Sequence, residues 1–326
     1  MKAILCREYG PPERLEYADV ESPVPRAGEI ILSVKACAVN FPDTLVIQGR
    51  YQFQPPMPFS PGTDIAGVVK SVGAGVTIPV PGDRVFGLVM SGGFAEEVAM
   101  PAAAAHPIPD GVDFVTAAAI QLTYGTAYHA LVDRARIQPG ETLLVLGAAG
   151  GVGMATIEVG KALGARVIAA ASSPEKVSAC LEAGADEGID YTHEDLRERI
   201  KALTSGKGVN VALDPVGGAF AEPTLRSVAW NGRYLVIGFT AGEIPRIPTN
   251  LPLLKGSSIV GVFYGGLLTQ EPALALANQR TLAEWLAAGR IKPRISATYP
   301  LREAARALED IAERRAVGKV VLVMGD

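Results

Sequence analysis

A glycine-rich segment in the middle of the chain has the composition of a phosphate-binding turn. Gly147–Gly153 follows the apolar run 142–146 and precedes a segment of helical pattern. Glycines let the backbone turn tightly and approach a pyrophosphate, and the following helix N-terminus offers free N–H groups. Ala148 replaces the first glycine of the G-x-G-x-x-G pattern, but the strand–turn–helix order favours dinucleotide binding over glycines that only allow close packing. The residues expected to contact the dinucleotide are Gly150, Gly151, Val152 and Gly153.

The residues after the next predicted strand bear on which dinucleotide binds. An NAD site usually has an acidic residue about 20 positions beyond the turn, where it binds the ribose hydroxyls. Strand 166–170 is followed by Ala171-Ser172-Ser173-Pro174-Glu175-Lys176, with no acid at its end. Ser173 and Pro174 are expected to begin a helix, which puts Lys176 in a first turn where the helix dipole disfavours a cation. A 2′-phosphate on the cofactor would explain this lysine, and a solvated surface position would explain it equally well.

The predicted secondary structure that must position these residues differs between the first and second parts of the chain. Residues 1 to about 120 contain short Val- and Ile-rich runs bounded by Pro and Gly, which is typical of a small β-barrel. From about residue 123 strands and helices alternate, which predicts an α/β domain with a doubly wound parallel sheet. Predicted strands are 30–36, 65–72, 83–87, 95–99, 142–146, 166–170, 209–213, 234–237, 259–262 and 319–323. Predicted helices are the segment from the glycine turn to Leu163, then 174–183, 270–289 and 300–315.

Composition narrows the class of protein. The chain has 326 residues, a net charge of −4, 48% hydrophobic residues and 20% charged residues, which fits about two globular domains and argues against disorder. This charge gives no electrostatic footprint for nucleic acid, and no run reaches the ~18 apolar residues of a transmembrane helix. The odd cysteine count, with no CxxC pair, fits a reduced intracellular compartment, so we expect a cytoplasmic protein without nucleic-acid or membrane partners.

Six motifs spread over nearly the whole chain carry a family resemblance. They are Val39–Asp43, Pro61–Gly67, Gly82–Val85, Ala148–Gly153, Asp214–Gly218 and Gly318–Leu322. With these motifs the chain resembles the medium-chain dehydrogenase/reductase superfamily, and within it the zinc-independent NADPH:quinone oxidoreductases of the zeta-crystallin group. The resemblance implies a GroES-like β-barrel catalytic domain over 1–122, a Rossmann NADPH-binding domain over 123–265, and a C-terminal segment, 266–326, that returns to the first domain. It also implies a homodimer.

At the positions where zinc dehydrogenases of this superfamily have zinc ligands, this chain has different residues. Zinc dehydrogenases of this superfamily place a Cys where Asn40 stands and a His-Glu where Thr63-Asp64 stand, and they carry a four-cysteine zinc lobe; none of these ligands is present. The histidines and cysteines also lack metal-ligand spacing. We therefore expect no metal, and a substrate whose own oxygen delocalises the charge of the incoming hydride, such as a quinone or an α,β-unsaturated carbonyl.

Three residues of the first domain are assigned to catalysis by the resemblance. Asn40 and Asp43 match positions that line the nicotinamide and substrate cleft. Pro42 is expected to keep Phe41 extended, so that one turn directs the side chains of Asn40 and Asp43 to the same site. The alternative is a polar turn whose side chains make only local hydrogen bonds. Tyr51 lies in a loop that covers the pocket in relatives and is assigned to the substrate oxygen, although an exposed tyrosine is the commoner fate.

Cofactor contacts are implied at five further positions. Thr126 matches a position near the nicotinamide, with a helix N-cap as its alternative role. Tyr191 matches a residue that stacks near the adenosine phosphate. Phe239 and Phe263 follow strands of the predicted parallel sheet, and ligands bind beyond the C-terminal ends of such strands, although core packing is the simpler explanation for an aromatic residue. Lys319, in the closing motif, is also assigned to the cofactor.

These observations predict an NADPH-dependent quinone oxidoreductase that transfers hydride from the nicotinamide. An enoyl or alkenal reductase, acting for example on acrylyl-type thioesters, is the alternative. A quinone needs a flat apolar slot and a CoA thioester a basic mouth, and the sequence does not decide between them because its Lys and Arg residues are spread along the chain. A crystallin-like protein that binds NADPH without turnover is a third possibility. Ser257–Val262 is predicted to be an apolar edge strand, which can pair with its own copy in a dimer.

Overall fold

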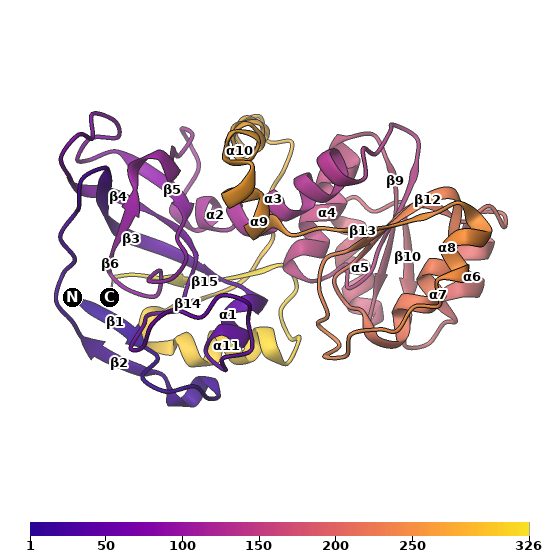
Figure 1. The fold of residues 1–326 in the computed structure, drawn as a ribbon, viewed down its shortest axis with the longest axis horizontal. Coiled ribbons are helices and arrows are strands. Elements are labelled where there is room, and N and C mark those ends of the chain that lie inside the picture. The colour runs from indigo at the N-terminus through magenta and orange to yellow at the C-terminus, as the bar shows by residue number, and fades with distance from the viewer. Residues whose placement is uncertain (326) are drawn as a thin grey trace. The chain divides into compact units, whose positions relative to one another are not determined.

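The computed structural model of this protein describes residues 1–325 and divides into two compact units. Unit 1 comprises Met1–Leu122 together with the described residues from Pro293 onward, and unit 2 comprises Thr123–Lys292. The N-terminal strands (indigo) and the C-terminal strands (yellow) therefore belong to the same unit (Figure 1). Residues 266–292, which the sequence analysis assigned to the returning segment, belong to unit 2 instead.

Unit 1 is built on a seven-stranded sheet in which β14 and β15 are parallel and the other pairs are antiparallel. The strand order is β14 (Ile295–Pro300), β15 (Lys319–Val323), β3 (Glu29–Val39), β4 (Asp64–Val72), β5 (Arg84–Leu88) and β7 (Ala105–Pro107), with β6 (Glu97–Pro101) paired to β3. A separate antiparallel pair is formed by β1 (Lys2–Leu5) and β2 (Glu16–Asp19). The helices are α1 (Phe41–Val46), α2 (Phe114–Ala118) and α11 (Ala304–Ala312).

The core of unit 1 lies around the long central strand β3. Apolar residues from β3, β4 and β15, including Ile30, Ile65 and Val320, form one buried cluster with residues of α11 such as Leu308. Burial of these side chains is the main favourable contribution to folding, at roughly 25 cal/mol per Å² of apolar surface. The C-terminal strand β15 is thus part of the core of the N-terminal unit, and its residues lie beside those of β3.

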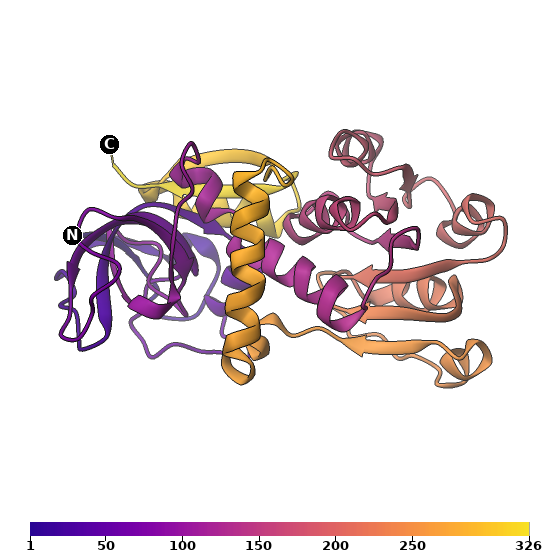
Figure 2. The ribbon, with the colours of Figure 1, turned by 90° about the horizontal axis from the view of Figure 1, so that it is seen from above.

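Unit 2 is a six-stranded parallel sheet with helices between its strands. The strand order is β10 (Glu187–Asp190), β9 (Arg166–Ala171), β8 (Thr142–Val145), β11 (Val209–Asp214), β12 (Val228–Val236) and β13 (Ser258–Gly261). Counted from β8, this is the order 3-2-1-4-5-6 of dinucleotide-binding sheets, which confirms the predicted Rossmann fold. The helices are α4 (Gly151–Ala162), α5 (Pro174–Glu182), α6 (Leu196–Leu203), α7 (Ala221–Arg226), α8 (Asn250–Lys255), α9 (Tyr264–Gln270) and α10 (Pro272–Ala287). Figure 2 shows α10 as one long, continuous helix (orange), and α3 (Gln121–Tyr128) spans the division between the units.

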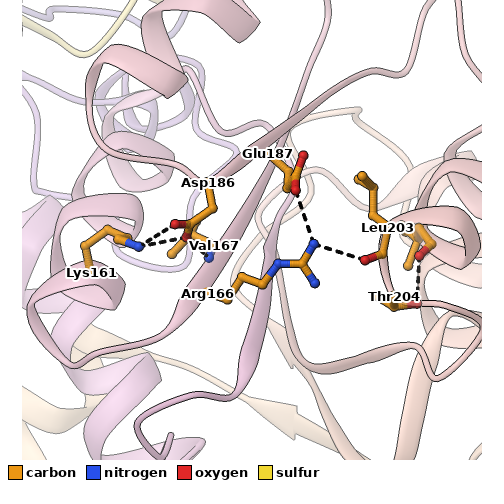
Figure 3. Close-up of polar contacts among 8 residues, drawn as sticks. Lys161, Arg166, Val167, Asp186, Glu187, Leu203 and Thr204 are labelled. Atoms are coloured by element: carbon orange, nitrogen blue, oxygen red, sulfur yellow. Dashed lines mark hydrogen bonds and ion pairs between the residues drawn. The ribbon is translucent and has the colours of Figure 1, made fainter.

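Ion pairs link β9 and β10 to each other and to neighbouring helices at the amino ends of these strands (Figure 3). Arg166 at the start of β9 contacts Glu187 at 3.3 Å and the carbonyl of Leu203 at 3.0 Å. Asp186 accepts from Lys161 at 2.7 and 2.8 Å, and from a backbone N–H of β9. These partly exposed pairs contribute little individually, ~0–1 kcal/mol. Because they lie at the amino ends of the strands, they leave the carboxyl edge available for the site.

The predicted elements are present, and several short ones were not predicted. The α-helices and strands without a counterpart in the sequence analysis are β10, α6, α7, α8 and α9 in unit 2, β1, β2, β7, β14, α1 and α2 in unit 1, and α3. One local prediction was wrong: Phe41 is not held extended by Pro42 but begins α1, with Asn40 as the N-cap residue. Proline is accepted within the first turn of a helix because its missing N–H would have no intrahelical partner there.

Candidate functional site

The glycine turn joins β8 to α4 in a conformation that requires glycine. A Cβ on Gly153 would lie 2.5 Å from the carbonyl oxygens of Gly147 and Ala148, so only glycine lets the helix pack against the turn. Gly147 has a positive φ of 55°. Gly150 is the N-cap of α4 and no side chain caps the helix, which leaves its first N–H groups for an anion. This geometry fits a pyrophosphate.

The start of α5 has the predicted cap and brings Lys176 to the end of β9. Ser173 is the N-cap and its Oγ accepts from the backbone N–H of Lys176 at 3.3 Å, with Pro174 as the first helical residue. Lys176 Nζ donates to Ser172 Oγ at 3.2 Å. The ammonium and two hydroxyls therefore gather at the point where an adenosine ribose is expected in a sheet of this order.

Tyr191 lies at the same edge of the sheet, directly after β10. Asp190 is opposite Ala171 in the parallel register of β10 and β9, so Tyr191 follows at the level of the α5 N-terminus. Its ring packs on Phe220, with centroids 4.6 Å apart. The Asp190 carboxylate accepts from Thr192 and contacts His193 at 2.7 Å, and these two hydrogen-bonding partners lower the pKa of Asp190 to about 2. Asp190, which the sequence analysis did not consider, is thus an acidic residue near the N-terminus of α5. Its carboxylate is already hydrogen-bonded to Thr192 and His193.

Two aromatic residues predicted to face the cofactor are exposed. Phe239 is 36% exposed and Phe263 is 61% exposed, so neither is simply a core residue. They follow β12 and β13, at the carboxyl edge of the sheet. The neighbouring turn is held by Asp214 at the end of β11, which accepts from the backbone N–H groups of Val216 and Gly217 at 2.7 and 2.8 Å. This buried carboxylate also accepts from a tyrosine hydroxyl of β12.

Thr126 lies inside α3 and is buried, so its alternative role as a helix N-cap is wrong. Its neighbour Gly125 is packed against Tyr264, because a Cβ there would lie 2.3 Å from the tyrosine ring. A second contact joins α3 to α4: the Tyr124 hydroxyl donates to Glu158 at 3.1 Å. Burial raises the pKa of Glu158 to about 7, although hydrogen bonds from the backbone of Lys292 and from the tyrosine favour its charged form.

In unit 1 the structure brings four buried polar residues together, each at most 5% exposed: Asn40, Asp43, Asp64 and Lys319. Asp43 accepts from the backbone N–H of Asn40 at 2.7 Å, as the third residue of α1. The Asn40 amide contacts both other members: its Nδ2 donates to Asp64 at 3.0 Å, and its Oδ1 accepts from Lys319. Lys319 Nζ lies 3.5 Å from Asp64 Oδ2, and Asp64 Oδ1 accepts from the backbone N–H of Leu122 at 2.9 Å.

Burial dominates the electrostatics of this cluster. It raises the pKa of Asp43 to about 7, helped by the negative charge of Asp64 and opposed by the Asn40 N–H and the Lys319 ammonium. Burial also lowers the pKa of Lys319, against the pull of both carboxylates. The pKa of Tyr51 is raised by burial and then by the charge of Asp43, so the tyrosine is close enough to sense that carboxylate.

Two members of this buried cluster, Lys319 and Asp64, had different roles in the sequence analysis. Lys319, assigned to the cofactor, belongs to unit 1 and contacts Asn40 and Asp64 there. Asp64 was noted only as a replacement for a zinc ligand. A sequence signal for it exists, because a single acid at the start of a strand as apolar as β4 needs a buried partner. Within residues 1–325 no three His, Cys, Asp or Glu side chains are grouped as metal ligands.

Comparison with known proteins identifies the family to which this chain is similar. The model of the alcohol dehydrogenase GroES-like domain matches residues 26–110, and that of the zinc-binding dehydrogenase matches residues 151–279. The quinone oxidoreductase-like protein 2 homolog of Nematostella vectensis is 39% identical, covering 98% of this chain and 88% of the relative. The quinone oxidoreductase of Rattus norvegicus is 36% identical, covering 99% and 98%.

Solved structures agree with the sequence relatives. Escherichia coli quinone oxidoreductase complexed with NADPH has a TM-score of 0.91 at 31% identity, covering 99% of this chain and 100% of that one. The quinone oxidoreductase of Pseudomonas syringae has a TM-score of 0.91 at 33% identity, covering 99% of each chain. No helix in the described part of the chain is long and apolar enough to span a membrane. This chain therefore belongs to the medium-chain dehydrogenase/reductase superfamily, within its quinone oxidoreductase group.

Proposed function

We propose that this chain is an NADPH-dependent oxidoreductase that reduces quinones or similarly activated carbonyls without zinc. The observation that carries the cofactor choice is the pairing of Lys176 with Ser172 directly after β9, a strand that ends without the acidic residue that would bind a ribose diol. The relatives named quinone oxidoreductase, one of them solved with NADPH, support both the cofactor and the substrate class.

The absence of zinc chemistry is proposed from the residues at the positions that match zinc ligands. Asn40 provides an amide, whose oxygen is already bound to Lys319, and Thr63 provides a hydroxyl. Zinc in proteins is bound by thiolate, imidazole or carboxylate groups, and Asp64 is the only one of these at the matching positions. Its carboxylate is occupied by Lys319, Asn40 and the Leu122 N–H.

In this proposal NADPH supplies the hydride, and the chain's own groups bind and orient the reactants. The first N–H groups of α4 hold the pyrophosphate, and Lys176 with Ser172 and Ser173 holds the 2′-phosphate. Tyr51 is the proposed donor to the substrate oxygen, where negative charge develops as hydride arrives. Its hydroxyl makes no hydrogen bond to any residue among 1–325, and Asp43 lies near enough to influence its ionisation.

The test is NADPH consumption with three classes of acceptor: quinones, alkenals and enoyl-CoA thioesters. Quinone turnover with the purified, metal-free protein is expected. Turnover restricted to enoyl thioesters would replace the quinone by the alternative substrate, and tight NADPH binding with no turnover would indicate a crystallin-like binding protein. Tyr51→Phe is expected to lower kcat/KM for quinone about 5- to 10-fold, the loss of one net hydrogen bond in the transition state. Tyr17→Phe, at an exposed tyrosine of β2, is the matched control and should change nothing.

We also propose a homodimer formed through β13. The structure places this strand at the edge of the unit 2 sheet, next to β12 only. Exposed apolar side chains gather there and on the preceding α8: Ile259, Leu253 and Leu254 are 43%, 78% and 68% exposed. An unpaired apolar edge is an aggregation hazard that pairing with a second copy removes. The cytoplasm remains the proposed location, supported by three cysteines that are all buried as thiols.

A further inference from the structure

A buried carboxylate holds the loop that follows β11 in unit 2. Asp214, the last residue of β11, is 1% exposed. Its Oδ1 accepts from the backbone N–H groups of Val216 and Gly217 at 2.7 and 2.8 Å, and its Oδ2 accepts from the Tyr234 hydroxyl on β12. Burial, and then the charge of Asp214, raise the pKa of the Tyr234 phenol above its ordinary value. The phenol therefore keeps its proton and remains a donor.

All three partners of this carboxylate are neutral. Two are peptide N–H groups and one is a phenol, so the carboxyl group accepts at every contact, as an ionised carboxylate does. A buried charge is costly and is commonly compensated by a cation. No Lys, Arg or His side chain in the described part of the chain forms an ion pair with Asp214. Unit 2 therefore holds a fixed negative charge that no ion pair neutralises.

The loop of this carboxylate lies beside the glycine turn. β11 pairs in parallel with β8, with Leu213 opposite Val145, so the loops that follow the two strands leave the same edge of the sheet. The loops are in contact, because a Cβ on Gly147 would lie 2.9 Å from Cγ2 of Val216. In the order 3-2-1-4-5-6, β8 and β11 are strands 1 and 4, and the crevice for a dinucleotide opens between them. Asp214 thus lies at the edge of this crevice.

The order of the strands also assigns the two halves of the dinucleotide. Each set of three strands in such a sheet holds one mononucleotide. Ser173 and Lys176, which follow β9, lie in the set that begins at the glycine turn, where the adenosine is expected. The other set, β11, β12 and β13, remains for the nicotinamide mononucleotide. The Asp214 loop belongs to this second set, and so does Phe239, since a Cβ on Gly217 would lie 2.9 Å from its ring.

We propose that the buried charge of Asp214 acts on the nicotinamide ring and favours the oxidised cofactor. The ring carries a positive charge in NADP⁺ and none in NADPH, so a fixed negative charge in the same half of the site stabilises NADP⁺ selectively. This makes bound NADPH a better hydride donor than it would be without the charge. The inference rests on the proposed NADPH-dependent function, and it gives Asp214 a role beyond holding its loop.

The test is the ratio of the dissociation constants of NADP⁺ and NADPH, measured by titration calorimetry with no acceptor present. Asp214→Asn removes the charge and can keep every hydrogen bond, because the amide oxygen accepts from the two N–H groups and the amide NH₂ can donate to the Tyr234 oxygen. NADP⁺ should then bind about 3- to 15-fold more weakly relative to NADPH, the range expected for one unit charge acting through protein. Asp214→Ser removes the charge in a smaller side chain and should shift the ratio in the same direction.

Two control variants separate the charge from packing and from net charge. Tyr234→Phe loses a hydrogen bond but keeps the carboxylate, so any loosening of the loop should weaken both nucleotides alike and leave the ratio unchanged. Asp186→Asn removes a carboxylate at the opposite, amino edge of the same sheet and should match the ratio of wild type.

An unchanged ratio in folded Asp214→Asn and Asp214→Ser would overturn the inference and leave Asp214 as a residue that only holds its loop. An equal shift of the ratio in Tyr234→Phe or Asp186→Asn would also overturn it, because both variants retain the charge of Asp214. Failure of the proposed function looks different, since the wild-type protein would then bind neither nucleotide or would oxidise NADPH with none of the acceptors.

Discussion

Lys176 provides the most direct test of cofactor choice. It is the third residue of α5, where the helix dipole disfavours a cation, and its ammonium contacts a neutral serine hydroxyl at 3.2 Å. A bound 2′-phosphate would add a charge-assisted hydrogen bond to this weak contact. Such a bond contributes ~1.5–3 kcal/mol, which is roughly 10- to 150-fold in affinity. Lys176→Ala should therefore weaken NADPH binding by about this factor and barely change NADH binding, since NADH has no phosphate there.

The assay is kcat/KM for NADPH and NADH in wild type and variants, at one fixed ionic strength because salt screens a partly exposed charge. Ser172→Asp should lower NADPH use further, since a carboxylate at this position would both bind the Lys176 ammonium and repel the phosphate. Lys201→Ala is the matched control: this lysine of α6 is 68% exposed and should have no effect on either cofactor.

Two results would refute the reasoning. If the wild-type enzyme prefers NADH, the residues after β9 do not select a phosphate. If Lys176→Ala lowers kcat/KM for both cofactors equally, the lysine supports α5 or the shared part of the dinucleotide, and the 2′-phosphate assignment is wrong.

Three further predictions concern pH, metal content and assembly. Burial raises the pKa of Glu158 from 4.5 to about 7, so the folded protein binds more protons than the unfolded chain between these values and stability falls as pH rises through that window. Glu158→Gln keeps an acceptor for Tyr124 and should add on the order of 2–3 kcal/mol to the free energy of unfolding at pH 8 but little at pH 4, by urea titration; equal gains at both pH values would contradict the buried charge. Purified protein should contain no stoichiometric zinc and should keep its activity in chelators, whereas one zinc per chain by elemental analysis would contradict the interpretation of Asn40 and Thr63. Light scattering at micromolar concentration should give a dimer mass for wild type and a monomer mass for Ile259→Asp on β13; a wild-type monomer would exclude the edge pairing.

The parts of the molecule that sequence reasoning predicted are those that depend on neighbouring residues. The apolar run 142–146, the glycine turn and the Ser173-Pro174 cap are local signals, and each was found where expected because a strand end, a tight turn and a helix cap are decided within a few residues. Short elements such as β10 and α8 escaped prediction, because four to six residues contain too few apolar positions to show a period. Phe41 was misjudged because the preference against helix before a proline is weak at the first turn.

The roles of the polar residues in unit 1 were decided only by tertiary structure. The sequence provided Asn40, Asp64 and Lys319 in three motifs and gave no measure of their separation. Pairing of β15 and β4 with opposite sides of β3 brought them into contact, and burial then made each hydrogen bond obligatory. A residue type states which bonds a side chain can make, whereas the partners available in the fold decide which of them remain for a ligand. For this reason the family resemblance could suggest a role for Asn40, and only the fold showed that its amide is bound to Asp64 and Lys319.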